Sequence, residues 1–139
     1  MLKRIATASI VLTLVVSGAA FAAAQTGAKV TLHQTSLGKR LATSTGRTLY
    51  LLTRDTSSTS ACTGSCASTW PPLLTGSKPV AGMGVKQSLL GTKKRGTKLQ
   101  VTYNGHRLYR YAGDSAAGQT NGEGSSGVWF TVKATGGKG

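Results

Sequence analysis

The chain has 139 residues, enough for one modest domain or for two small repeats that share a core. It carries 17 basic against 3 acidic residues, a formal net charge of +14. This excess favours anionic partners such as envelope polymers or a membrane surface, although it also fits plain solubility. Nucleic acid is not an expected partner, because the basic residues are scattered and Lys93-Lys94-Arg95 is short for a dedicated patch.

The first 24 residues have the pattern of a cleavable signal peptide. Lys3 and Arg4 precede an apolar run over 5–16, which is short for a bilayer span, and small residues follow it. We therefore expect an exported protein, periplasmic or extracellular, with no transmembrane segment after cleavage. No cysteine lies in or just after this segment, so we expect no lipid anchor. Removal of Lys3 and Arg4 leaves 15 basic against 3 acidic residues, a net charge of +12.

The mature chain begins with short segments that alternate between strands and turns. We predict strands at 30–33, 40–43 and 47–52 and turns at 36–38 and 44–46. The last two strands should form a hairpin. Within the third strand Tyr50 and Leu52 share one face, while Leu49 and Leu51 share the other. Because both faces are apolar, this strand should be central and covered on both sides.

The middle of the chain is polar and interrupted by prolines and glycines. Residues 53–66 are rich in serine and threonine and allow a single helical turn near Cys62. Pro71 and Pro72 remove two backbone donors, so the segment that begins at Trp70 should be an edge or a strap. We predict a connecting loop at 78–84 and a basic turn at 88–96.

A clear hairpin follows, in which an alternating strand at 98–103 meets the turn Asn104-Gly105 and returns over 106–111. On the return strand Tyr109 and Tyr111 lie opposite Leu108 and Arg110, which predicts a half-buried strand. A Gly/Ser-rich loop at 113–127 and a closing strand at 127–132 complete the chain.

One stretch of the sequence occurs twice. The segment 46–55 returns as 105–114, and the shift of 59 positions superposes the only two aspartates, Asp55 and Asp114, and the only two tryptophans, Trp70 and Trp129. It also superposes Tyr50 on Tyr109. The sequence therefore predicts a mainly β fold, a small antiparallel β domain built from two sequence-similar repeats, 25–77 and 78–139, with long Gly/Ser-rich loops.

Cys62 and Cys66 are separated by three residues. In an oxidising compartment this spacing favours a tight structural disulfide, which would shape the loop ahead of Trp70. A redox dithiol or a thiolate metal site is the alternative, but the spacing is not Cys-x-x-Cys and no histidine is near in the sequence.

The two aspartates allow two interpretations. A pair of carboxylates could perform acid–base hydrolysis, but each aspartate ends a strand and begins a polar loop, where it typically caps a turn. The aromatic residues could form a binding surface or a core: Tyr50, Tyr109, Tyr111, Trp70 and Trp129. We predict no metal at His33 and His106 and no other cofactor, because no phosphate loop or dinucleotide fingerprint is present.

Together these motifs resemble the bacterial family of secreted repeats of unknown function, also described as predicted lipoproteins with a Tyr-x-aromatic-x-x-Asp motif. The second repeat fits the motif through Tyr109, Tyr111 and Asp114, whereas Leu52 replaces the usual aromatic in the first. The resemblance implies no activity. We therefore predict a non-enzymatic, envelope-associated or secreted binding or structural module. The alternative is a redox or hydrolytic protein that uses Cys62 and Cys66 or Asp55 and Asp114.

Overall fold

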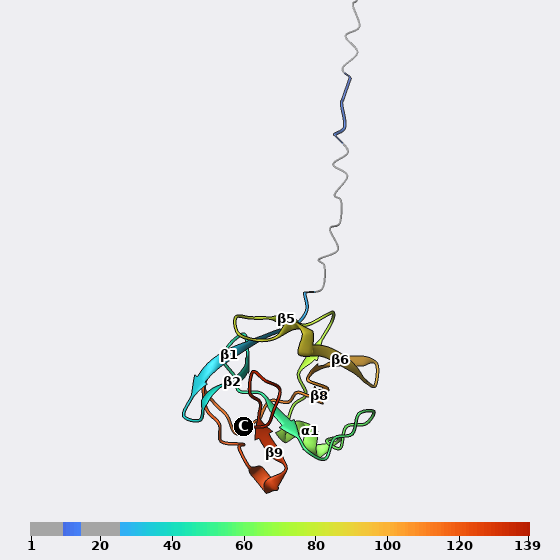
Figure 1. The fold of residues 1–139 in the computed structure, drawn as a ribbon. Coiled ribbons are helices and arrows are strands. Elements are labelled where there is room, and N and C mark those ends of the chain that lie inside the picture. Colours follow the sequence, from blue (N-terminus) through green and yellow to red (C-terminus); the bar gives the residue numbers. More distant parts are fainter. Residues whose placement is uncertain (1–9, 15–25) are drawn as a thin grey trace, which may run out of the picture.

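The computed structural model describes residues 10–14 and 26–139 (Figure 1). The predicted signal peptide, 1–24, lies outside the described residues apart from 10–14, which form no regular structure. In the part of the chain that is described, no helix has the length and apolar character needed to cross a membrane. The elements follow in this order: β1 (Lys29–Thr35), β2 (Gly38–Thr43), β3 (Tyr50–Leu52), α1 (Ser65–Thr69), β4 (Leu74–Thr75), β5 (Val80–Ala81), η1 (Gln87–Leu89), β6 (Leu90–Arg95), β7 (Lys98–Tyr103), β8 (His106–Arg107), η2 (Ser125–Gly127) and β9 (Trp129–Thr131).

Two long antiparallel hairpins form the frame, and they lie on opposite sides of the molecule in Figure 1. β1 pairs with β2 from Val30–Thr43 to Thr35–Gly38, and β6 pairs with β7 from Leu90–Tyr103 to Arg95–Lys98. The predicted turn at 88–96 is therefore wrong. Its glycines and basic residues suggested a turn, but the residues alternate between more and less covered positions along a strand, and only the residues between Arg95 and Lys98 turn.

Short strands join these hairpins into small sheets. β5 lies parallel to β1, within the predicted 78–84 loop, and β4 forms the edge of the sheet β4-β7-β6. The edge position agrees with the prediction from the two prolines. Asn104 and Gly105 have positive φ values of 49° and 79°, as the predicted hairpin turn requires. The return strand is shorter than predicted, because β8 covers only His106–Arg107.

The predicted hairpin between 40–43 and 47–52 is present over its first residues: Ala42 bridges to Thr48, the N–H of Thr43 donates to the Arg47 carbonyl, and the N–H of Leu49 donates to the Leu41 carbonyl. The main partner of β2 is β1, and β3 pairs instead with β9, with Tyr50 opposite Thr131. The end of the chain therefore closes against its first half. The hairpin is shorter than predicted, because from Tyr50 onwards the strand pairs with β9 and no longer with β2.

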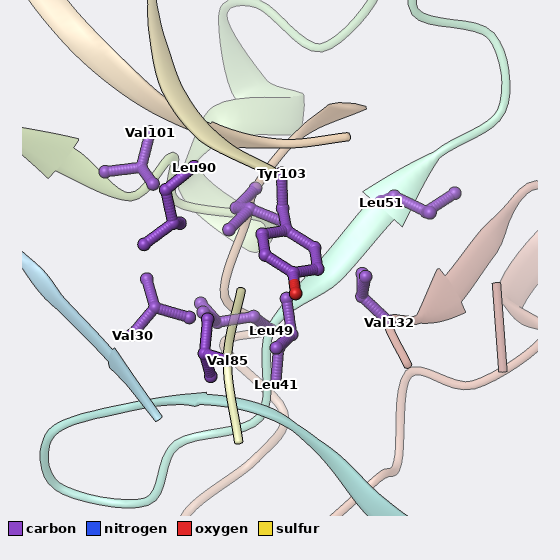
Figure 2. Close-up of a cluster of buried hydrophobic side chains, with 10 residues drawn as sticks. Val30, Leu41, Leu49, Leu51, Val85, Leu90, Val101, Tyr103 and Val132 are labelled. Atoms are coloured by element: carbon purple, nitrogen blue, oxygen red, sulfur yellow. The ribbon is translucent and has the colours of Figure 1, made fainter. Parts of the chain in front are cut away.

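The alternation along β3 divides the interior into two clusters. Leu49 and Leu51 contact a cluster of aliphatic residues and Tyr103, shown in Figure 2, whereas Tyr50 and Leu52 contact an aromatic cluster around Cys62. All four side chains are buried, as predicted for a central strand. The half-buried arm predicted at 106–111 differs from the structure: Leu108 and Tyr109 are both fully buried, on opposite sides, and only His106 and Arg110 are exposed.

Candidate functional site

The two copies of the repeated stretch meet at a local two-fold arrangement. The backbone N–H of Tyr50 donates to the carbonyl of Tyr109 at 2.8 Å, and the N–H of Tyr109 donates to the carbonyl of Tyr50 at 2.9 Å. Tyr50 also pairs with Thr131, and Tyr109 bridges to Pro72, whose positions differ by the same 59 residues. Equivalent residues therefore make equivalent pairings across the contact between the repeats.

The two tryptophans lie in the same arrangement. Their rings stack on each other with centroids 3.9 Å apart and planes 3° from parallel. Each also contacts the tyrosine of its own repeat edge-on: Tyr50 and Trp70 at 5.4 Å, Tyr109 and Trp129 at 5.1 Å. Because the rings are buried, most of this contact is core packing and little of it is a binding surface.

The tyrosines and aspartates cross between the repeats. The Tyr50 hydroxyl donates to Oδ2 of Asp114 at 2.6 Å, and the Tyr109 hydroxyl donates to Oδ2 of Asp55 at 2.7 Å. The second oxygen of each carboxylate accepts a backbone N–H from its own loop, from Ala61 to Asp55 and from Asn121 to Asp114. Each aspartate therefore bonds its own loop, as a capping residue would, and at the same time joins the other repeat.

Burial keeps both phenols protonated. It raises the pKa of Tyr50 well above its usual value, and the hydrogen bond to Asp114 raises it further. Burial also raises the pKa of Tyr109, with the bond to Asp55 acting in the same direction and the bond to Ser60 opposing it. A protonated phenol donates and a carboxylate accepts, so this geometry favours a structural role for the motif over acid–base chemistry.

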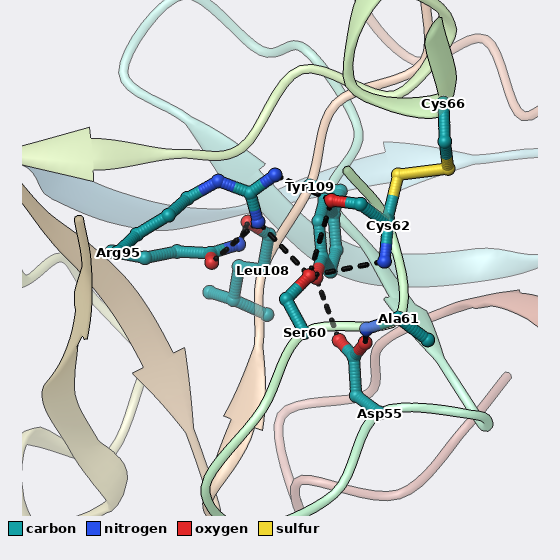
Figure 3. Close-up of a disulfide and its surroundings, with 9 residues drawn as sticks. Asp55, Ser60, Ala61, Cys62, Cys66, Arg95, Leu108 and Tyr109 are labelled. Atoms are coloured by element: carbon teal, nitrogen blue, oxygen red, sulfur yellow. Dashed lines mark hydrogen bonds between the residues drawn. A yellow bond between two sulfur atoms is a disulfide. The ribbon is translucent and has the colours of Figure 1, made fainter. Parts of the chain in front are cut away.

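The loop between Asp55 and Trp70 contains the disulfide, with the Cα atoms of Cys62 and Cys66 5.2 Å apart (Figure 3). The helical turn allowed near Cys62 is α1, which contains Cys66. Cys62 is fully buried in the aromatic cluster, and the N–H of Trp70 donates to the carbonyl of Cys66. The bridge therefore connects the polar loop directly to the tryptophan stack.

Ser60 and Arg95 tie this loop to the second hairpin, a contact that the sequence analysis did not predict. The Ser60 hydroxyl lies 2.7 Å from the Tyr109 hydroxyl, and Arg95 donates to Ser60 Oγ at 2.9 Å and to the Cys62 carbonyl (Figure 3). A chain of polar groups thus runs from a guanidinium through two hydroxyls to Asp55. The hydrophilic character of 53–61 offered no signal for it, because the partners are about 35 residues or more away.

The equivalent loop of the second repeat has no disulfide. There the Gly122 N–H donates to the Tyr50 hydroxyl at 3.3 Å, and Glu123 Oε2 accepts the Thr131 N–H at 2.7 Å. A side chain at Gly122 would meet the Trp70 ring at 2.6 Å, so the backbone itself packs on the aromatic cluster.

Tyr111 breaks the symmetry of the repeats. It is half-buried and stacks on Trp70 at 4.3 Å, whereas Leu52 occupies the equivalent position in the first repeat. Tyr111 also lines a hollow of about 260 Å³ together with Arg47, Arg110 and Asp114. The equivalent hollow of the other repeat is lined by His106, Leu51 and Asp55. The fold is repeated, but the chemistry of these two hollows is not.

The two histidines lie in different settings. His33 is on β1, next to Gly46 and Gly118, and His106 is on β8. In the described part of the chain, no three side chains among His, Cys, Asp and Glu come close enough together to hold a metal ion.

A family model described as a secreted repeat of unknown function matches the chain twice, over residues 31–74 and 90–133. Each match contains one hairpin, one tyrosine, one aspartate and one tryptophan of the arrangement above, and each lies within one of the two repeats predicted from the sequence. No similar chain was found among the curated proteins or the solved structures.

Proposed function

Given that the chain belongs to the family of secreted repeats of unknown function, whose description assigns no activity, we propose that it is a non-enzymatic binding module for anionic partners outside the cytoplasm. The partners would be anionic envelope polymers or a membrane surface, and the protein would be periplasmic or extracellular without a lipid anchor. Its two repeats supply a rigid frame, and its basic side chains supply the attraction.

One observation carries this proposal: the fold uses its carboxylates internally. Asp55 and Asp114 each accept a tyrosine and a backbone N–H, and Glu123 accepts the N–H of Thr131. These three are the only acidic residues of the sequence. Of the basic residues that the structure describes, only Arg107 is buried. The outward charge is therefore largely uncompensated, which favours association with anionic surfaces.

The test measures binding of the chain without residues 1–24 to vesicles that contain phosphatidylglycerol, with phosphatidylcholine vesicles as the control. At about 10 mM salt the Debye length is about 30 Å, and at about 150 mM it is about 8 Å. We expect binding only to the anionic vesicles, with a steep loss between these salt concentrations. Equal binding to both kinds of vesicle, or no binding at low salt, would contradict the proposal.

A further inference from the structure

A pocket beside the disulfide loop gathers positive charge in a way that diffuse attraction does not require. It has a volume of about 260 Å³ and lies between the polar loop of the first repeat and the β6–β7 hairpin of the second. Lys94 and Arg95 line it from the end of β6, and Arg107 lines it from β8. No acidic side chain is among its lining residues.

The two guanidinium groups of this pocket have only neutral acceptors. Arg95 donates to Ser60 Oγ, to Gln100 Oε1 and to a backbone carbonyl. Arg107 donates to Gln100 Oε1 at 3.1 Å and to the Lys94 carbonyl at 3.2 Å. Two adjacent cations thus share one amide oxygen, without a carboxylate to balance either charge.

Arg107 is the unusual member of this group. Its side chain is only 3% exposed, and its Nε has no hydrogen-bond partner. Burial of a charged group without an opposite charge is costly, and the cost falls when a counter-ion is supplied. The polar chain from Arg95 through Ser60 and Tyr109 ends at Asp55, but that carboxylate already accepts the tyrosine.

We infer that this pocket is a binding site for a phosphate group, such as the phosphodiester of an anionic polymer or a phospholipid headgroup. Guanidinium groups suit the oxygens of a phosphate, and Lys94 adds an exposed ammonium at the rim. Ser58 and Thr59 line the opposite wall and add hydroxyl donors. The inference deepens the proposed function and rests on it only for the source of the phosphate.

The hollow that contains Arg47 and Arg110 is the natural comparison. It also holds two guanidinium groups, but Asp114 lines it, and Arg47 donates to the backbone carbonyl of Asp114 at 2.9 Å. A carboxylate in the wall weakens the attraction for a second anion. Arg110 is exposed and outside the proposed pocket, so Arg110→Gln removes one charge and serves as the matched control.

The experiment titrates the chain without residues 1–24 with inorganic phosphate, at a constant ionic strength of about 150 mM to suppress diffuse attraction. Backbone amide shifts are followed by NMR in the parent, Lys94→Gln, Arg95→Gln and Arg110→Gln. We expect saturable shifts at residues 58–63 and 94–96 in the parent and in Arg110→Gln. Lys94→Gln and Arg95→Gln should each weaken binding about tenfold or more, the loss expected for a charge-assisted hydrogen bond.

A second arm identifies the source of the phosphate by competition with glycerophosphate, a headgroup analogue, and with a soluble polymer of phosphodiester-linked glycerol. The compound that competes more strongly shows whether the pocket prefers a headgroup phosphate or the phosphodiester of a polymer. The inference is overturned when the amide shifts do not saturate as phosphate is added, or when Arg110→Gln weakens phosphate binding as much as the pocket variants do. Vesicle binding at low salt that survives in Lys94→Gln and Arg95→Gln would leave the proposed function intact without a role for the pocket. If the phosphate titration and the vesicle assay both show no binding, the pocket inference and the proposed function are both contradicted.

Discussion

The loop after Asp55 and the loop after Asp114 occupy equivalent places, each between a tyrosine–aspartate pair and a tryptophan. In both, the carboxylate accepts a backbone N–H from its own loop, six residues on in the first and seven in the second. The first loop is then closed by the Cys62–Cys66 bridge, and the second by glycine backbone packed on the aromatic cluster and by Glu123. Duplication has kept the contacts that join the repeats, whereas each loop has its own means of closure.

This difference separates what the motif does from what the loops do. The paired tyrosines, aspartates and tryptophans lie at the contact between the repeats, where a substitution in one repeat also removes contacts made by the other. Much of each loop is exposed, and the first contributes to the cationic pocket through Ser58, Thr59 and Ser60. We therefore expect the largest losses of stability at the shared contact and smaller ones in the loops.

The largest effect should come from the tryptophan stack. Trp129→Ala and Trp70→Ala each remove a buried ring that stacks on the other, and each should lower the free energy of unfolding by about 3–5 kcal/mol. Because the two rings share one contact, the double variant should lose less than the sum of the single losses. Urea unfolding of the three variants measures this. Additive losses would show that the repeats are stabilised independently.

The crossing hydroxyls come next, and they should be unequal. Tyr50→Phe leaves Asp114, which is 8% exposed, without its tyrosine donor, so about 2 kcal/mol should be lost. Tyr109→Phe should cost about 1 kcal/mol, because Asp55 is more exposed and water can replace the donor. Thermal melts compare the two variants with the parent. Equal losses would contradict the assigned difference in burial.

Reduction of the disulfide should lower the free energy of unfolding by only about 1–2 kcal/mol, because the ring that it closes is short. It should loosen the first loop and leave the second unchanged. Hydrogen exchange before and after reduction would show the difference, with Ala61 and Trp70 amides as reporters and Asn121 as the internal control. Faster exchange in both loops would indicate that the bridge supports the whole domain.

The sequence predicted the repeats, the β class, the second hairpin and the bridged cysteines, because each depends on local pattern or on rare residues in register. It did not predict that Tyr50 would bond Asp114 and Tyr109 would bond Asp55, since a register says which residues are equivalent but not how two copies face each other. It also assigned 88–96 to a turn, because a basic strand next to a glycine has the composition of a loop. The sequence did not predict the cationic pocket either, because Lys94, Arg107 and Ser58 come together only when the hairpin packs on the loop.

The smallest expected effect near neutral pH is the response to alkali, which tests the burial and the hydrogen bonding of the Tyr50 hydroxyl together. The pKa of Tyr50 is raised in the folded protein, whereas an unfolded tyrosine titrates near pH 10. Below about pH 10 both states hold the proton and the contribution of Tyr50 to stability is complete. Above about pH 10 the unfolded state loses its proton first and binds fewer protons than the folded state, so this contribution falls as pH rises. The stability gap between the parent and Tyr50→Phe should therefore be constant from about pH 7 to 9 and narrow towards about pH 11. Lysine titration affects both proteins alike and cancels in the difference. A gap that stays constant to about pH 11 would mean that burial and the hydrogen bond to Asp114 do not raise the pKa of Tyr50 in the folded protein.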